Sequence, residues 1–284
     1  MKTIKATFLV ASGTLFFLSV SAQSTSIDAS QIGDNAKVGR YVKTRGINMY
    51  YETYGTGEPM LMIHSNGGSI SNFMYQVPYF AINYKVIVAD SRAQGKTADT
   101  KDSLTYEMMA DDFNGLLDSL HLDSCYAIGW GDGAIDALLL AVRHPDKVKK
   151  MAITGAYLSP DTSAVDPSAY DWALNYNASF RKIRQTPEVR NNSKVAHLLS
   201  YEPLININLL RKIQCPTLVI GGDHEVVLPK HTVLIAQTIP KSYLWILPNA
   251  GHSTPIFHKD LFNQVVGDFF RTPYKKPKAY DLFN

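Results

Sequence analysis

The sequence predicts an α/β fold in which helices cover both faces of a mostly parallel sheet. Short, continuous apolar runs that end at Gly, Asp or a polar loop are typical of strands buried on both faces. Between these runs, apolar residues recur at helical spacing. Strands that alternate with amphipathic helices form a parallel sheet with helices on each side. With 284 residues, 45% of them apolar, the chain can build one sizeable core.

The predicted strands start with a hairpin. Residues 41–54 alternate weakly around Arg45-Gly46, which favours two antiparallel strands joined by a turn. Each later strand corresponds to one apolar run, and the six runs cover residues 60–63, 86–89, 126–128, 151–153, 218–220 and 243–247.

The predicted helices fill the intervals between these runs. Residues 106–120, 135–142 and 262–269 each place their apolar side chains on one helical face. The alternation stops at residues 157–211, which are rich in Asn, Ser, Tyr and Pro and contain two predicted helices. We interpret this segment as a helical cap over the carboxyl ends of the strands, where open α/β sheets bind their ligands.

The predicted organisation is one α/β core that the cap interrupts. A leader and a polar linker precede the core, and a polar tail follows it. The boundaries are residues 1–22 for a signal peptide, 23–40 for the linker, 41–156 and 212–271 for the core, 157–211 for the cap and 272–284 for the tail.

The leader has the features of a secretory signal peptide. Lys2 and Lys5 form a positive start, residues 7–20 are mostly apolar, and small residues surround the cleavage point at Ala22. The apolar run is short for a membrane span. We therefore expect cleavage and a periplasmic or secreted protein without a stable membrane span, with an uncleaved anchor as the alternative.

Composition and motifs exclude several kinds of partner. The formal net charge is +3, and without Lys2 and Lys5 the chain keeps 26 basic residues against 25 acidic ones, so no nucleic-acid partner is expected. Metal-binding and cofactor motifs are absent, so we expect neither a metal nor a cofactor. The expected partner is a small molecule.

The two cysteines, Cys125 and Cys215, are predicted to be free and buried. Each opens an apolar run, and a third strand is expected between their two strands. Strands that are next but one lie about 9–10 Å apart, which is beyond the reach of a disulfide.

Residues 128–134 hold the most informative motif, Ile-Gly-Trp-Gly-Asp-Gly-Ala, at a predicted strand-to-helix junction. It matches the nucleophile elbow Gly-x-Ser-x-Gly, in which the flanking glycines let a strand turn sharply into a helix. Gly129 and Gly133 are in register with those glycines. The apex, where the elbow exposes its attacking serine, is Gly131.

Two other segments accompany the elbow. Residues 90–97 read Asp-Ser-Arg-Ala-Gln-Gly-Lys-Thr, and residues 143–148 read Arg-His-Pro-Asp-Lys-Val. With these segments, residues 41–270 resemble the α/β-hydrolase superfamily. Around the elbow the chain is similar to the biphenyl-hydrolase-like (valacyclovir hydrolase-like) amino-acid ester hydrolases, whose elbow reads Gly-Trp-Ser-Asp-Gly. The resemblance implies an α/β-hydrolase fold with a small helical cap, and cofactor-independent action on small esters or amides.

The resemblance also places the rest of the site. It implies that Asn66 and Asp132 supply the oxyanion-hole amides, which stabilise the charge that develops on the substrate oxygen. It implies that the orienting acid is Glu225, with Asp223 as the alternative. The catalytic histidine is then His252, in the family's chain order of apex, acid and histidine.

Asp132, Ser65 and Trp130 are expected to contact the substrate. In the amino-acid ester hydrolases, an Asp after the nucleophile holds the substrate's ammonium group, and the resemblance implies this role for Asp132. The alternative is a carboxylate that only interacts with the positive end of the following helix.

An elbow without a nucleophile leaves three interpretations. The first is a catalytically inactive pseudo-hydrolase that binds a small ligand or a protein. In the second, His252, oriented by Glu225, activates a water beside Gly131 for direct attack. In the third, Ser65 or Ser69 acts as a relocated nucleophile. We favour retained hydrolase chemistry because the histidine and the acid are both present.

Overall fold

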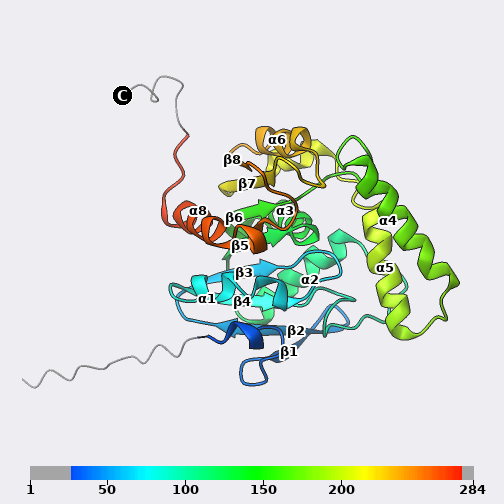
Figure 1. The fold of residues 1–284 in the computed structure, drawn as a ribbon. Helices are drawn as coiled ribbons and strands as arrows, with labels where there is room; N and C mark the ends of the chain where they lie inside the picture. Colours follow the sequence, from blue (N-terminus) through cyan, green and yellow to red (C-terminus); the bar gives the residue numbers. More distant parts are fainter. Residues whose placement is uncertain (1–26, 277–284) are drawn as a thin grey trace, which may run out of the picture.

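An eight-stranded sheet forms the centre of residues 27–276, which the computed structural model describes (Figure 1). Its strand order is β1-β2-β4-β3-β5-β6-β7-β8. The hairpin β1–β2 is antiparallel and β2 pairs antiparallel with β4, whereas the remaining neighbours are parallel. The predicted fold class is confirmed. The strands are β1 (Arg40–Thr44), β2 (Ile47–Tyr54), β3 (Glu58–Ile63), β4 (Tyr84–Ala89), β5 (Cys125–Trp130), β6 (Val148–Thr154), β7 (Thr217–Gly222) and β8 (Ser242–Leu247).

The helices that the sequence predicts are present, and the structure of residues 27–276 adds three others, α1, α6 and α7. Those predicted for the core are present as α2, α3 and α8, with bounds within a few residues of the predicted ones. The α-helices are α1 (Gln76–Phe80), α2 (Tyr106–Ser119), α3 (Asp132–Arg143), α4 (Pro167–Ser179), α5 (Pro187–Tyr201), α6 (Pro229–Thr238), α7 (Thr254–Phe257) and α8 (Lys259–Arg271). Short 3₁₀ helices cover Ala29–Gln31, Ile70–Phe73, Pro145–Lys147, Phe180–Lys182 and Ile207–Lys212.

Alternate side chains of the central strands enter two apolar cores, one on each face of the sheet. In β3, Leu61 and Ile63 belong to the core that includes α2 and α3. Met60 and Met62 belong to the core that includes α1 and α8. Because both faces are buried, the central strands need apolar residues at every position, which explains their continuous apolar runs.

Helices α4 and α5 lie within the segment predicted as a cap, residues 157–211, and pack side by side at one end of the molecule (Figure 1). Each begins with Pro at its first turn. The preceding residue caps each helix: Asp166 accepts from the Ser168 N–H, and Thr186 accepts from the Val189 N–H. Local sequence signals thus define both helices.

The predicted state of the cysteines is confirmed. Cys125 and Cys215 are both free and buried, and β6 separates the strand that Cys125 opens from the strand that follows Cys215. Burial raises the pKa of the Cys125 thiol to about 12 and that of the Cys215 thiol to about 11. Both thiols are therefore protonated at neutral pH.

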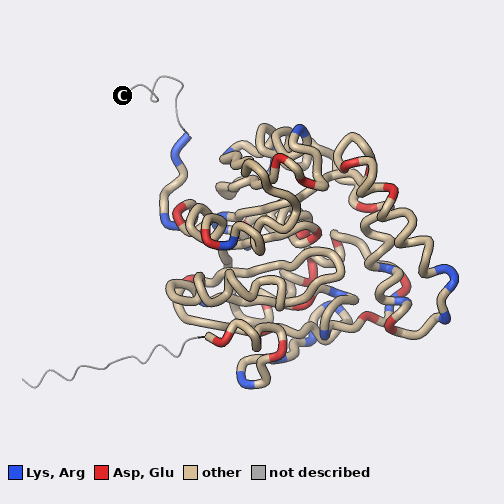
Figure 2. Tube along the Cα trace, viewed as in Figure 1, with Lys and Arg blue, Asp and Glu red and all other residues tan. Residues whose placement is uncertain are grey.

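Basic and acidic residues are interspersed along the described chain (Figure 2). Of the helices in residues 27–276, none combines the length and hydrophobicity needed to cross a membrane. The predicted signal peptide, residues 1–22, lies outside the described residues, as do 23–26 of the predicted linker and 277–284 of the predicted tail.

Candidate functional site

Gly131 joins β5 to α3 at a sharp turn. Its φ of 58° and ψ of −119° define a conformation that strains any residue with a side chain. The flanking glycines allow close packing, because a side chain at Gly129 would overlap the Gly133 carbonyl and one at Gly133 would overlap the Ile63 carbonyl. The backbone therefore makes the strand-to-helix turn that the motif predicts.

His252 and Glu225 form a hydrogen-bonded pair beside this turn. His252 Nδ1 lies 2.5 Å from Glu225 Oε1, and the Glu225 side chain is fully buried. The ring's other nitrogen, Nε2, lies 3.1 Å from the point where a Cβ at residue 131 would stand. Asp223, the alternative acid, instead contacts His224 at 2.8 Å. The structure thus brings Glu225, and not Asp223, to the predicted histidine.

The pair favours the charged form of the imidazole. Burial lowers the pKa of His252, but the hydrogen bond and the negative charge of Glu225 outweigh this and raise the pKa above the usual 6.5. Oε2 of Glu225 is buried without a hydrogen-bond partner among residues 27–276. The negative charge on this carboxylate, which lies against His252, favours the protonated, positively charged form of the imidazole.

The Ser65 hydroxyl lies above Gly131. A side chain at residue 131 would overlap this hydroxyl, and its Cβ would stand 3.1 Å from the Ser65 Cβ. The backbone of Ser65 is held from both sides, since its carbonyl accepts from His64 Nδ1 at 2.8 Å and from the Gly68 N–H at 3.0 Å. The loop after β3 therefore presents Ser65 to the elbow.

Asp132, the first residue of α3, is buried beside Gly131. Asn66 Nδ2 donates to its Oδ2 at 2.6 Å, and the Tyr106 hydroxyl also bonds to the carboxylate. Burial raises the pKa of Asp132 to about 6. At the first position of a helix the backbone N–H has no acceptor within the helix, so this amide can donate to a ligand.

A cavity of about 480 Å³, here called the main cavity, opens beside these groups. Its polar part lies at the elbow, and its apolar part is formed largely by the segment predicted as a cap. Trp172 and Tyr176 of α4 stack there, with ring centroids 5.1 Å apart. The volume is typical of a small-molecule site. The lining residues are Ser65, Asn66, Gly67, Gly131, Asp132, Tyr157, Val165, Ala169, Tyr170, Trp172, Ala173, Tyr176, Leu199, Val226, Val227 and His252.

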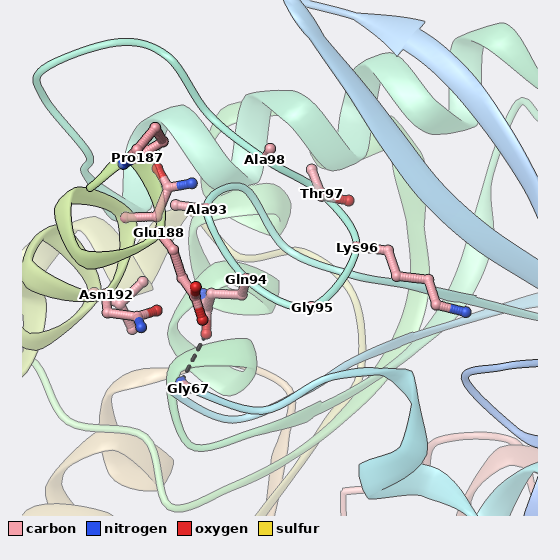
Figure 3. Close-up of a pocket in the computed structure, with 12 residues that line it drawn as sticks. Gly67, Ala93, Gln94, Gly95, Lys96, Thr97, Ala98, Pro187, Glu188 and Asn192 are labelled. Carbon is pink, nitrogen blue, oxygen red and sulfur yellow. Dashed lines mark hydrogen bonds between the residues drawn. The ribbon is translucent and has the colours of Figure 1, made fainter.

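A second cavity, of about 380 Å³, lies between the loop after β4 and the start of α5 (Figure 3). Figure 3 shows Gln94 reaching toward Gly67, whose N–H donates to the Gln94 side-chain oxygen at 2.7 Å. Neither Gly131 nor His252 lines this cavity. Its contribution to the site is the bond from Gly67, which fixes the turn that follows Ser65.

Comparisons with known proteins find similarity to α/β hydrolases. A family model described as the α/β hydrolase fold matches residues 58–194. The 2-hydroxymuconate semialdehyde hydrolase of Pseudomonas sp. (strain CF600) is 27% identical over 271 residues, which cover 83% of this chain and 95% of that protein. The serine hydrolase BPHL of Mus musculus is 24% identical, covering 81% of this chain and 85% of its own.

The chain has the α/β-hydrolase fold and resembles members of that superfamily. Solved structures share its fold: the enol-lactonase from Burkholderia xenovorans LB400 has a TM-score of 0.71 at 20% identity and covers 82% of this chain and 100% of its own. MGS-M2, an α/β hydrolase from a Medee basin deep-sea metagenome library, has a TM-score of 0.74 at 17% identity, with 84% and 100% covered. At these identities the likeness shows the α/β-hydrolase fold alone.

Most of the site residues predicted from the resemblance to this superfamily lie together. Ser65, Asn66, Asp132 and His252 line the main cavity around Gly131, and Glu225 lies behind His252. Asn66 takes part through its side chain as well as its backbone, because its amide bonds to Asp132 and, at 3.1 Å, to the Val195 carbonyl of α5. The side-chain bonds link the loop after β3 to both α3 and α5.

Trp130, predicted to contact the substrate, lies outside the main cavity. As the last residue of β5, it points to the face of the sheet that carries α1 and α8, because side chains alternate along a strand. Its indole N–H donates to the His252 carbonyl at 2.9 Å. Trp130 therefore supports the loop that carries the histidine.

Sequence reasoning missed Gly155 and the pair Tyr106 and Tyr157. A side chain at Gly155, whose φ is 71°, would stand 2.7 Å from Cε1 of His252, so glycine there leaves room for the imidazole. The available signal was a glycine separated by one residue from the apolar run 151–153. The two tyrosine hydroxyls lie 3.3 Å apart next to Asp132, a contact between residues 51 positions apart that no local pattern indicates.

Proposed function

We propose that this protein hydrolyses small carboxylic esters, with His252 as the general base and Glu225 as the group that orients it. The observation that carries the proposal is the 2.5 Å contact between His252 Nδ1 and the buried Glu225, with Nε2 facing the space above Gly131. Relatives named as hydrolases, at 24–27% identity over most of the chain, support hydrolysis as the reaction class.

The geometry supports the following chemistry. His252 Nε2 accepts a proton from the attacking hydroxyl as its oxygen bonds to the carbonyl carbon, and later returns that proton to the leaving alcohol. Glu225 stabilises the imidazolium that forms in between. The backbone amides of Asn66 and Asp132 are proposed to donate to the oxyanion. General-base assistance of this kind contributes about 10²–10⁴-fold to the rate.

The main cavity supports an ester with an apolar acyl or aryl group. Trp172, Tyr176 and the aliphatic residues of the lining provide the apolar wall opposite the polar elbow. Asp132 is mostly ionised at neutral pH, which is above its pKa of about 6, and its carboxylate could pair with a substrate ammonium group. We therefore propose two ester classes for testing, neutral aryl or alkyl esters and aminoacyl esters.

A second candidate function is ligand binding without turnover. The observation that favours it is Gly131, because an acyl-enzyme at the elbow requires an oxygen on the apex residue. A pseudo-hydrolase of this kind would retain the main cavity and bind the acids or esters that fit it.

A matched ester screen separates the two functions. The wild type should hydrolyse p-nitrophenyl esters of acetate, butyrate and benzoate, and His252→Ala should lower turnover at least about 100-fold. His197→Ala, which removes an exposed imidazole of α5, is the control and should leave turnover unchanged. Turnover that survives His252→Ala would refute the catalytic proposal. Saturable binding of butyrate or benzoate without any turnover would favour the binding function.

We also propose export, which is supported by the leader of residues 1–22. Expression of the full chain in a bacterium should yield a mature protein that begins after Ala22, measurable by intact mass of the periplasmic or extracellular fraction. A full-length protein confined to the cytoplasm would contradict this proposal.

A further inference from the structure

The Ser65 hydroxyl and His252 Nε2 border the same small space. A Cβ at residue 131 would overlap that hydroxyl and would also stand 3.1 Å from Nε2. Both residues line the main cavity, so a substrate that enters it reaches both. Gly131 contributes no side chain to this space. The oxygen that the protein presents there is therefore the oxygen of Ser65.

We propose that Ser65 is the nucleophile of this hydrolase and that it carries the acyl group during turnover. The inference rests on the proposed function, since it requires an ester substrate and His252 as the base. It adds the identity of the attacking atom, which is a side chain on the loop after β3 in place of a residue at the elbow.

The loop holds Ser65 rigidly enough for this role. Its carbonyl accepts from His64 Nδ1 and from the Gly68 N–H, while His64 Nε2 accepts from the Ser91 N–H at 3.0 Å. His64 is buried, and burial lowers its pKa, in keeping with a neutral ring that donates through Nδ1 and accepts through Nε2. With its backbone fixed, Ser65 needs only a rotation about its Cα–Cβ bond to move Oγ relative to Nε2. Catalytic hydrogen bonds of this kind often shorten only when substrate binds.

Each step balances with the groups present. The Ser65 Oγ–H proton passes to His252 Nε2 while Oγ bonds to the ester carbonyl carbon. The carbon–oxygen bond to the alcohol then breaks, and the alcohol oxygen takes the proton from Nε2, which leaves an acyl ester on Ser65. Water repeats the sequence with Nε2 again as the base, releasing the carboxylic acid and restoring the serine hydroxyl.

Ser69, four residues further along, provides the matched control. It precedes the 3₁₀ helix Ile70–Phe73, and its hydroxyl lies 2.8 Å from that of Ser71. It does not line the main cavity. The same loop thus offers one serine at the elbow and one away from it.

Covalent trapping tests the proposal. The full-length protein is incubated with a fluorophosphonate, which phosphorylates or phosphonylates an activated serine with loss of fluoride, and the adduct is mapped by peptide mass spectrometry. We expect one adduct per chain on Ser65, present in Ser69→Ala and absent in Ser65→Ala and His252→Ala. Ser65→Ala should also lower kcat for p-nitrophenyl esters by at least about 10³-fold, as loss of a triad nucleophile does.

The outcomes separate the two proposals. No adduct on Ser65, together with turnover that needs His252 but not Ser65, overturns the inference and leaves direct attack by water, so the proposed function stands. An adduct on another serine overturns the inference as well. Absence of both turnover and adduct in the wild type means that the proposed function itself has failed.

Discussion

Arg92 and Asp136 are each only 1% exposed, yet their surroundings differ. Arg92, in the loop after β4, donates two bonds of 2.6 Å to Asp112 and one of 3.0 Å to Asp99. Lys194 of α5 also contacts Asp99, at 2.7 Å. Asp136, one turn along α3 from Asp132, has no hydrogen-bond partner on either carboxyl oxygen in the described part of the chain.

The contrast shows two uses of buried charge. Around Arg92 each buried acid has a basic partner, and these ion pairs join the loop, α2 and α5. Along α3, burial raises the pKa of Asp136 well above its usual value and that of Asp132 to about 6. Because the pKa of Asp132 is about 6, this carboxyl at the elbow can gain or lose a proton near neutral pH, and the region can respond to a ligand through its charge.

The largest expected effect comes from breaking the matched cluster. Arg92→Met leaves Asp99 and Asp112 buried with less compensation, and we expect it to lower the free energy of unfolding by about 3–5 kcal/mol. Urea denaturation at pH 7 measures this change. The control is Arg271→Met, which removes an arginine whose partner, Asp268, is about as exposed as itself, and it should cost about 0–1 kcal/mol. Equal effects of the two substitutions would show that the Arg92 cluster is not the structural group we describe.

Glu225→Gln tests the other region of this comparison, the elbow. The amide keeps the size of the side chain but removes its charge. Burial, the largest influence on His252, is then opposed only by the negative charge of Asp132 and lowers the pKa of the ring. Since the neutral imidazole is the active form, the rising limb of the pH–rate profile should move from above pH 6.5 in the wild type to a lower pH. We also expect kcat to fall about 100-fold, or about 2.7 kcal/mol, because the imidazolium loses its counter-charge.

The matched control for Glu225→Gln is Asp223→Asn, in the same loop. Asp223 is partly exposed and contacts His224, so its substitution should leave the limb where it is. A shift caused by Asp223→Asn, and none by Glu225→Gln, would reverse the assignment of the orienting acid.

The same contrast marks what the sequence could predict. The turn at Gly131 and the histidine loop carry short motifs whose spacing is local, so the sequence predicts both at one site, and the structure places His252 beside Gly131. The chain order also indicated Glu225, but the choice over Asp223 depends on which side chain turns inward, and only packing decides that. Asp136 lies in an apolar helix that the sequence predicts well, yet nothing local shows that its carboxyl lacks a partner.

The sequence also does not determine the direction in which the side chains of Ser65 and Trp130 point. Both were expected to contact the substrate, and both flank glycine-rich turns. Trp130 is rotated to the opposite face of the sheet because strand alternation continues to the last residue of β5. Ser65 faces Gly131 because His64, Gly68 and the Gly67–Gln94 bond fix its loop, contacts that span up to 27 residues.

The smallest expected effect concerns Asp132. It tests whether protonation of this buried carboxyl changes the free energy of unfolding with pH. The pKa of this carboxyl is 3.8 when unperturbed and about 6 in the folded protein, so the folded state holds the proton more tightly than the unfolded state. The stability that this provides is complete below pH 3.8 and is lost as the pH rises through 6. Asn has no proton to lose and can still accept from Asn66. We therefore expect Asp132→Asn to match the wild type at pH 4 and to exceed its free energy of unfolding by about 1–2 kcal/mol at pH 8, measured by urea denaturation.

If Asp132 also binds an ammonium group, the same variant should lose turnover of aminoacyl esters more than that of neutral esters. The reason is that the neutral amide keeps its bond to Asn66 but removes the charge that attracts the cation. A gain in stability at pH 8 with equal losses for both ester classes would mean that Asp132 affects the pH dependence of stability but does not bind the ammonium group. No gain in stability would mean that the elbow carboxylate is compensated as fully as the acids around Arg92, and the contrast between the two regions would not hold.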